Sequence, residues 1–285
     1  MRALVVRAGA LGDLILLRPV VASLRAAGAS VTLLAPERPG SALVGPGAEE
    51  AQRLISWDGP VVTKLMAGEP AAELGDYEVA LCYSRSAELA RGLESVSGRV
   101  IVHDPRQKPY DRPDPLDVLG IPRVEPSPMR PTAEEHGQAG AWLDRLPRGF
   151  VAVHPGSGSA RKNWPFERFI ETARVLSADH LWLLSLGPAE ADARADGAIV
   201  ARDLPPRLLG AVLAQAGLYL GNDSGVSHLA AAWGAPTIAL FGPTDPAVWS
   251  PRGPRVRTLR EPDEAMTSIR VEDVVACARR LMAAG

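Results

Sequence analysis

The chain has 285 residues, 46% of them hydrophobic, and a formal net charge of −2 at pH 7. This length exceeds that of one typical compact core and predicts about two domains, while the near-neutral charge gives no electrostatic reason to expect nucleic-acid binding. The two cysteines, Cys82 and Cys277, lie far apart, which argues against a disulfide framework and against a zinc site. No apolar run reaches the roughly 18 residues that a membrane-spanning helix needs, and Arg7 ends the first apolar stretch, so a cytoplasmic protein is expected.

The first half of the chain alternates short apolar segments with amphipathic ones. Residues 2–7 predict a first strand and residues 13–27 a helix. Further strands are expected at 30–35, 78–83 and 99–102. Eight prolines between residues 104 and 131 exclude a long helix or a central strand, so that stretch is predicted to be loop and interdomain connection.

The second half repeats the alternation. Its predicted strands and helices are, in chain order, strand 150–154, helix 165–177, strand 181–186, strand 198–200, helix 206–216, strand 218–220, strand 237–241 and helix 268–284. Apolar strands without strict polar alternation favour parallel sheets that are covered by helices on both faces. The predicted fold class is therefore α/β, with two Rossmann-like domains whose parallel sheets face a central cleft. The predicted domains are 1–140 and 141–265, and 266–285 is predicted to be a C-terminal helix that packs back on the first domain.

The segment 218–232 is the most informative part of the chain, because an apolar strand runs through a polar turn into an alanine-rich helix. The free N–H groups and the dipole of such a helix favour an anion, and Gly221 and Gly225 allow close approach of the backbone. Ser224, Ser227 and His228 add side-chain donors. The carboxylate of Asp223 would repel a phosphate, so it is expected to hold a sugar hydroxyl or to order the turn. A nucleotide that carries a sugar would use both halves of this turn.

A second glycine-containing turn, residues 7–13, follows the first predicted strand. Gly9 and Gly12 form only G-x-x-G, which is neither a dinucleotide fingerprint nor a P-loop. Asp13 stands where a carboxylate caps a helix and is stabilised by its dipole. The same carboxylate could also act as a general base, and the two roles are compatible.

A third segment, residues 154–165, combines a small-residue loop with two cations before a helix. The hydroxyls of Ser157 and Ser159 could reach diphosphate oxygens, and Lys162 could stabilise a departing phosphate. Arg161 is the competing cation, and a solvated surface lysine is the alternative reading of Lys162.

Four ordered blocks resemble glycosyltransferase family 9, the ADP-heptose:lipopolysaccharide heptosyltransferases. They are Gly-Ala-Leu-Gly-Asp with Arg18-Pro19, His-Pro-Gly-Ser leading to Lys162-Asn163-Trp164, Asn-Asp-Ser-Gly-Val-Ser-His, and the block at 241–246. The resemblance implies a GT-B fold, a nucleotide-sugar donor in the C-terminal domain, and inverting, metal-independent transfer to an acceptor in the N-terminal domain. Neither a cofactor nor a bound metal is then expected.

By this resemblance Asp13 matches the catalytic base and Lys162 the diphosphate-binding lysine. The further implied donor residues are Ser157, Gly158, Glu190 at the ribose, Asp223, Ser224, Gly225 and His228. On the acceptor side the expected residues are Gly12, Arg7 and Arg18. Other cations that could meet a phosphorylated or acidic acceptor, or simply be surface charges, are Arg99, His103, Arg106, Lys108 and Arg112.

The expected function is transfer of heptose from ADP-heptose to a hydroxyl of a glycan or lipopolysaccharide-type acceptor. Its partners would be a nucleotide-sugar donor and a glycan or glycolipid acceptor, without nucleic acid, and peripheral contact with the inner membrane face would be compatible with a glycolipid. Three alternatives stay open: a sugar-nucleotide epimerase or hydrolase, a non-catalytic sugar-nucleotide-binding protein, and a nicotinamide-dependent oxidoreductase. The missing G-x-G-x-x-G disfavours the last of these.

Overall fold

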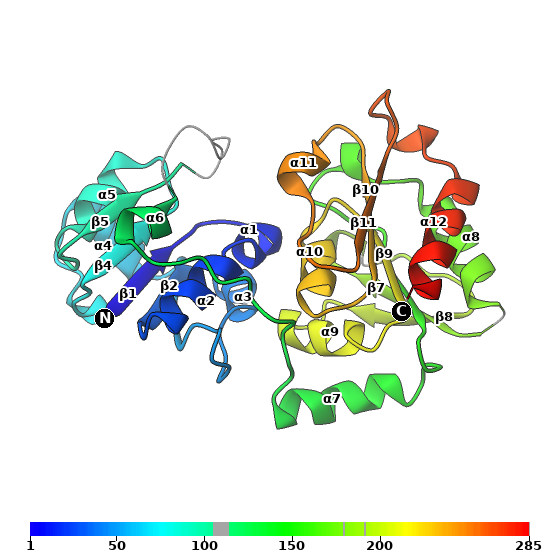
Figure 1. Cartoon of the computed structure of the whole chain (residues 1–285), viewed down its shortest axis with the longest axis horizontal. Coiled ribbons are helices and arrows are strands. Elements are labelled where there is room, and N and C mark those ends of the chain that lie inside the picture. Colours follow the sequence, from blue (N-terminus) through cyan, green and yellow to red (C-terminus); the bar gives the residue numbers. More distant parts are fainter. Residues whose placement is uncertain (105–113, 179, 191, 285) are drawn as a thin grey trace. The chain divides into compact units, whose positions relative to one another are not determined.

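The computed structural model describes residues 1–104, 114–178, 180–190 and 192–284. The chain divides into two compact units, Met1–Ser127 and Pro128–Gly285 (Figure 1). The boundary lies inside the proline-rich stretch that was predicted to connect the domains. No helix within the described ranges is long and apolar enough to cross a membrane.

A parallel five-stranded sheet forms the centre of the first unit, in the order β3-β2-β1-β4-β5. The strands are β1 (Arg2–Val6), β2 (Ser30–Ala35), β3 (Arg53–Ser56), β4 (Val79–Cys82) and β5 (Val100–Val102). Successive side chains of a strand point to opposite faces. Ala3 and Val5 accordingly pack into one buried cluster, while Leu4 and Val6 pack into another on the opposite face. Both faces are covered, as the continuous apolar strands predicted.

Helices cover this sheet on both faces. They are α1 (Leu11–Ile15), α2 (Arg18–Ala26), α3 (Glu37–Ser41), α4 (Pro60–Ala67), α5 (Ala87–Leu93) and α6 (Pro115–Leu119), with a 3₁₀ turn at Ala72–Leu74. The single helix predicted over 13–27 is in fact two helices. Pro19 has no N–H to donate to the carbonyl of Ile15, so the first helix stops and a second begins with the proline in its first turn.

The second unit contains a parallel six-stranded sheet in the order β11-β10-β9-β6-β7-β8. Its strands are β6 (Val151–His154), β7 (Trp182–Leu186), β8 (Ala198–Arg202), β9 (Leu218–Asn222), β10 (Thr237–Phe241) and β11 (Val256–Arg260). The chain builds outward from β6 to β8 and then returns to the other side of β6 with β9. The segments that leave the carboxyl ends of β6 and β9 therefore diverge, and such a switch point is where open α/β sheets bind ligands.

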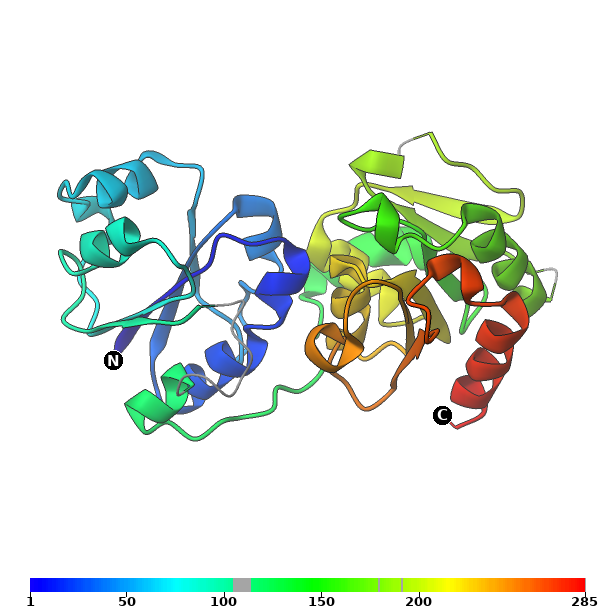
Figure 2. The ribbon, with the colours of Figure 1, turned by 90° about the horizontal axis from the view of Figure 1, so that it is seen from above.

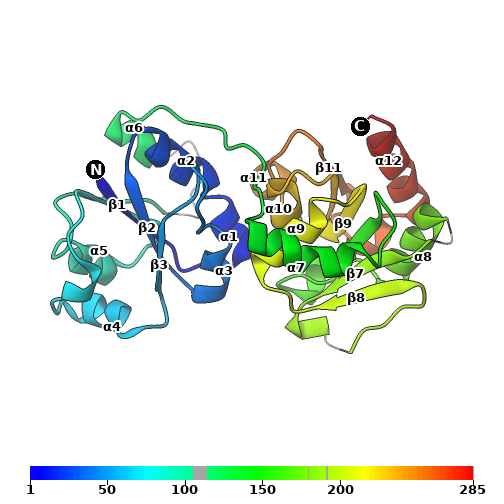
Figure 3. The same ribbon diagram turned by 90° about the horizontal axis from the view of Figure 1, so that it is seen from below.

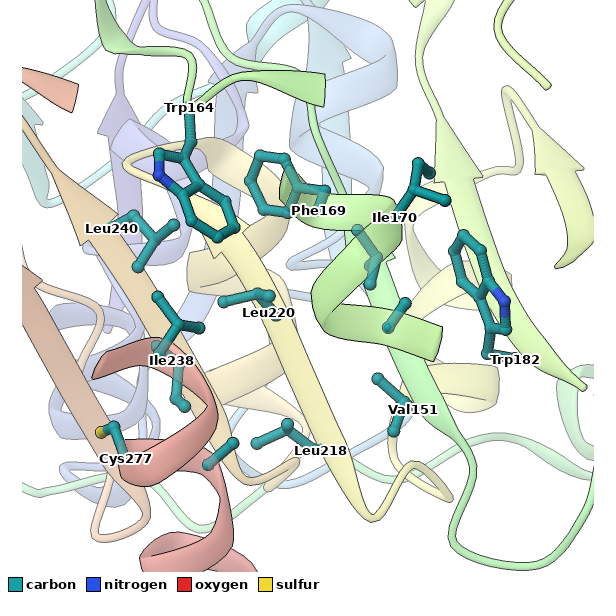
Figure 4. Close-up of a cluster of buried hydrophobic side chains, with 14 of the residues drawn as sticks. Val151, Trp164, Phe169, Ile170, Trp182, Leu218, Leu220, Ile238, Leu240 and Cys277 are labelled. Carbon is teal, nitrogen blue, oxygen red and sulfur yellow. The ribbon is translucent and has the colours of Figure 1, made fainter. Parts of the chain in front are cut away.

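The helices of the second unit enclose a large aromatic and aliphatic core. They are α7 (Ala133–Leu143), α8 (Phe166–Ser177), α9 (Pro206–Leu213), α10 (Gly225–Ala232), α11 (Pro246–Trp249) and α12 (Val271–Ala283), with 3₁₀ turns at Ala160–Lys162, Pro188–Glu190 and Met266–Ser268. Figure 4 shows Trp164 and Phe169 over the side chains of the central strands. Their rings meet edge to face with centroids 5.0 Å apart, a favourable aromatic geometry.

Two predictions about the domains need correction. The first domain was predicted to extend to residue 140, but the first unit ends at Ser127, and α7 packs on α9 in the second unit. Arg207 Nε donates to Glu135 Oε1 at 2.5 Å and links the two helices. Helix α12 was predicted to pack on the first domain, but its apolar face, including Val274 and Cys277, belongs to the core of the second unit and packs on α8. Figures 2 and 3 show α12, in red, alongside α8.

Candidate functional site

Two loops at the carboxyl edge of the second sheet meet at the switch point between β6 and β9. One runs from Pro155 to Trp164 after β6, and the other is the turn Asp223–Ser224 that leads into α10. Ser224 is the N-cap of α10, and its hydroxyl accepts from the backbone N–H of Ser227 at 3.4 Å. The remaining N–H groups of the first helical turn provide a positive end at this edge.

Asn222 joins the two loops through both ends of its side-chain amide. Its Nδ2 donates to the carbonyl oxygen of Pro155 at 2.7 Å, and its Oδ1 accepts from the backbone N–H of Trp164 at 3.0 Å. The side chain is fully buried. Asn222 thus holds the beginning and the end of the loop that contains Lys162. Sequence reasoning did not assign this role, although one signal was available, since Asn163 and Asn222 are the chain's two asparagines.

Lys162, Asp223 and Thr244 form a polar cluster at this edge. Lys162 Nζ lies 3.1 Å from Asp223 Oδ2, and Thr244 Oγ1 donates to the same oxygen at 2.8 Å. The side chain of Asp223 is 9% exposed and that of Lys162 24%. Arg161 is exposed to solvent. The geometry therefore favours Lys162 over Arg161 as the cation of the site.

Buried hydrogen bonds of Ser227 hold the turn Asp223–Ser224 in place. Ser227 Oγ donates to the backbone oxygen of Asn222 at 2.5 Å and lies 3.2 Å from the hydroxyl of Tyr219. A Cβ at Gly221 would lie 2.4 Å from that tyrosine hydroxyl and 2.9 Å from Ser227 Oγ. The surroundings of Gly221 therefore require a glycine for internal packing.

The small-residue loop also uses its polar groups internally. Ser157 Oγ lies 2.6 Å from Asn163 Oδ1 and 2.8 Å from the carbonyl oxygen of Ser159. Ser157 therefore shapes the loop through these contacts. Around Gly158 a Cβ would meet nothing within 4 Å, so that backbone position is open.

Glu190 lies directly against this loop from the neighbouring strand β7. Its Oε2 accepts from the backbone N–H of Gly187 at 3.2 Å, and a Cβ on Gly156 would lie 2.5 Å from its Oε1. Gly156 thus leaves the space that the carboxylate occupies.

His154 is the last residue of β6 and is buried. Burial lowers the pKa of His154, whose Nδ1 is 2.9 Å from the carbonyl oxygen of Ser185. The histidine is neutral at pH 7, with Nδ1–H donating.

In the first unit, Asp13 lies at the corresponding switch point between β1 and β4. Its Oδ2 accepts from the backbone N–H of Ala10 at 3.0 Å, which confirms the capping role, and its Oδ1 pairs with Arg7. Arg7 Nη1 lies 3.5 Å from the carbonyl oxygen of Tyr83. Gly12 occupies the first turn of α1 next to Asp13. Two of the three predicted acceptor residues therefore lie beside the proposed base.

Arg18, the third residue predicted for the acceptor side, bonds to the end of the first unit. Its Nη2 donates to the carbonyl oxygen of Ser127 at 2.6 Å, and Glu49 binds the backbone N–H of the same serine at 2.8 Å. Burial lowers the pKa of Arg18, whereas the negative charges of Glu49 and Glu50 raise it by a smaller amount. Arg18 thus anchors the end of the first unit.

Two of the other candidate cations lie in the described part of the chain. Arg99 donates to the carbonyl oxygen of Val118 at 3.1 Å, and His103 packs edge-on against the ring of Tyr83. Arg106, Lys108 and Arg112 lie outside the described residues.

The loops of the second unit thus bring together the predicted donor residues at one sheet edge. They are Ser157, Gly158, Lys162, Glu190, Asp223, Ser224, Gly225 and His228. Among the residues that the structure describes, no group of three or more His, Cys, Asp and Glu side chains is placed to bind a metal.

Three solved structures that are described as glycosyltransferases or heptosyltransferases match this chain over nearly its whole length. A glycosyl transferase family 9 protein of Veillonella parvula matches with a TM-score of 0.82 and 20% identity over 100% of this chain and 97% of that one. E. coli ADP-heptose lps heptosyltransferase II gives 0.72 and 19% over 100% and 99% of the two chains. E. coli heptosyltransferase WaaC with ADP gives 0.70 and 19% over 99% and 100%. These likenesses show a fold of the GT-B type.

A comparison with curated protein sequences gave no match. The family model described as glycosyltransferase family 9 (heptosyltransferase) matches residues 117–278, more than half of the chain. The match covers the loops after β6 and β9, and with them the cluster of Lys162, Asp223 and Thr244. The chain belongs to glycosyltransferase family 9.

Proposed function

We propose that this glycosyltransferase moves heptose from ADP-heptose to a hydroxyl group of a glycan or lipopolysaccharide-type acceptor. The observation that carries the proposal is the pairing of Lys162 with Asp223 at the N-terminus of α10 and at the switch point of the sheet. A cation and a helix N-terminus suit a diphosphate, and an adjacent carboxylate suits sugar hydroxyls. The E. coli enzyme whose structures contain ADP and ADP-2-deoxy-2-fluoro heptose shares this fold, which supports the choice of donor.

In the donor site, Lys162 and the first turn of α10 would bind the diphosphate. This positive charge stabilises the leaving group as the bond between the anomeric carbon and the diphosphate oxygen breaks. Because the protein itself supplies that charge, we propose a metal-independent reaction. Glu190 would contact the ribose, and Asp223 would accept hydrogen bonds from the sugar.

Asp13 would act as the general base. It takes the proton of the acceptor hydroxyl as that oxygen bonds to the anomeric carbon, and a single displacement of this kind inverts the anomeric configuration. The hydrogen bonds from Arg7 and from the Ala10 backbone orient the carboxylate. The proposal includes a cytoplasmic location, with peripheral membrane contact if the acceptor is a glycolipid.

Nucleotide binding tests the donor site. In thermal-shift titrations with ADP, UDP, GDP and NAD at equal concentrations, ADP should raise the unfolding midpoint most, because a ligand that binds only the folded state stabilises it. Lys162→Ala should weaken ADP binding about tenfold or more, as expected when a hydrogen-bonded charge partner is lost. Arg161→Ala, the matched control, should bind like the wild type. Stabilisation by NAD alone, or equal effects of the two substitutions, would contradict the assignment.

Turnover tests the reaction. With ADP-heptose and heptose-deficient lipopolysaccharide, the wild type should release ADP and extend the acceptor. Asp13→Ala should abolish transfer while ADP affinity stays within about twofold, because a base acts in the transition state. Consumption of ADP-heptose without acceptor at the same rate would instead indicate a hydrolase or epimerase.

A further inference from the structure

Thr244 occupies a defined position beside the donor cluster. It follows β10, the strand next to β9, whereas Asp223 directly follows β9. The backbone N–H of Asp223 donates to the carbonyl oxygen of Leu240 at 2.9 Å, which fixes the two strand ends against each other. From this position Thr244 Oγ1 reaches Asp223 Oδ2 at 2.8 Å.

The place of this hydroxyl does not depend on a ligand, because its loop is anchored to the rest of the second unit. Arg260 Nε donates to the carbonyl oxygen of Gly242 at 3.0 Å. The backbone at Gly242 also packs closely on Met266, since a Cβ there would lie 2.8 Å from the sulfur. Asp245, the next residue, caps α11 by accepting from the N–H of Ala247 at 2.9 Å.

Thr244 and Lys162 converge on the same oxygen of Asp223. Both distances, 2.8 and 3.1 Å, are to Oδ2, so within the described part of the chain these two donors leave Oδ1 for another partner. Lys162 is the group that a diphosphate would attract. If Lys162 turned toward the phosphates, Asp223 would lose this cation, and Thr244 would be left to hold the carboxylate in place.

We propose that Thr244 is a positioning residue that keeps Asp223 directed at the sugar of the donor after Lys162 has engaged the diphosphate. This inference rests on the proposed donor site. Its consequence is selectivity: the hydroxyl matters for a nucleotide that carries a sugar and little for the bare nucleoside diphosphate.

The experiment compares Thr244→Val with Thr244→Ser by calorimetric titration with ADP and with ADP-heptose. Valine keeps the shape and removes the donor, while serine keeps the donor. Thr244 is only partly buried, so neither change should unfold the chain. For Thr244→Val we expect ADP affinity within about twofold of the wild type and ADP-heptose affinity lowered about tenfold. Thr244→Ser should restore ADP-heptose binding.

A second measurement repeats Thr244→Val in the Lys162→Ala background. In Lys162→Ala, Thr244 is the donor that remains on Asp223 Oδ2 among the described residues, before a nucleotide binds as well as after. The losses of ADP-heptose affinity caused by the two substitutions should therefore be non-additive. Unchanged ADP-heptose affinity in Thr244→Val, or an equal loss for both ligands, would overturn the positioning role while leaving the proposed function intact. A wild-type protein that binds neither ligand would overturn the proposed function and this role with it.

Discussion

Replacing Asn222 with alanine should loosen the loop that contains Lys162. The substitution removes both hydrogen bonds of the side chain, one to the carbonyl oxygen of Pro155 and one from the N–H of Trp164. All three residues are buried, so water does not readily replace the lost partners. The loop would then be held by its internal contacts and by the packing of Trp164.

The size of the effect follows from the two orphaned groups. A buried donor or acceptor left without a partner costs about 1–3 kcal/mol, so the pair together costs about 2–6 kcal/mol. The Trp164 N–H accounts for about 1–3 kcal/mol of this cost, and its hydrogen exchange should therefore accelerate roughly 5- to 150-fold. ADP affinity should fall as well, because binding must now order the loop.

Hydrogen exchange of the segment 156–164, combined with ADP titration, is the appropriate assay. It reports the loop locally, whereas global unfolding of a two-unit chain does not give one free energy. Thr172→Val is the matched control, because Thr172 is fully buried in α8 and its hydroxyl donates to the Arg168 carbonyl oxygen of the same helix at 2.7 Å. It should leave loop exchange and ADP affinity unchanged. Wild-type exchange and affinity in Asn222→Ala would refute the reasoning.

Burial lowers the pKa of His154 below its ordinary 6.5, so the unfolded chain binds the proton first and stability should decline as pH falls below about 6.5. The unfolding midpoint measured from pH 8 to 5 should show this decline. The decline should be smaller in His154→Asn, and an equal pH dependence of the midpoint in that variant would contradict the assignment. Burial also raises the pKa of the Cys82 thiol to about 11 and raises that of the second cysteine, so Ellman's reagent at pH 8 should label neither thiol in the folded protein and both in guanidinium. Rapid labelling without denaturant would count against this burial. Gly156→Ala forces the Glu190 carboxylate to move and should weaken ADP binding by about 1–3 kcal/mol. Gly158→Ala, with open space around the new methyl group, should leave ADP binding unchanged. Equal ADP affinities of the two variants would exclude a donor role for the contact between Gly156 and Glu190.

Local sequence patterns determined most of the regular structure. The strands at 30–35 and 237–241 were predicted with the bounds that the structure shows, because each is a short β-branched and aliphatic run with clear ends. The patterns also located the turns after β1, β6 and β9, since glycine, serine and a charged residue between a strand and a helix are a local signal. Helix α7 was missed although Thr132 and Glu135 form a capping box, and β3 was missed because its residues are only partly buried.

The partners of the side chains at the site were decided only by the tertiary structure. The amide of Asn222 and the hydroxyl of Thr244 give no local sign of what they bind. Their partners come from other loops, and the order of the strands brings those loops together: β9 lies between β6 and β10. The sequence by itself therefore determined which residue types stand in the loops of the candidate site. Sheet order, which depends on packing between segments far apart in the chain, decided that Lys162 and Thr244 share one oxygen of Asp223.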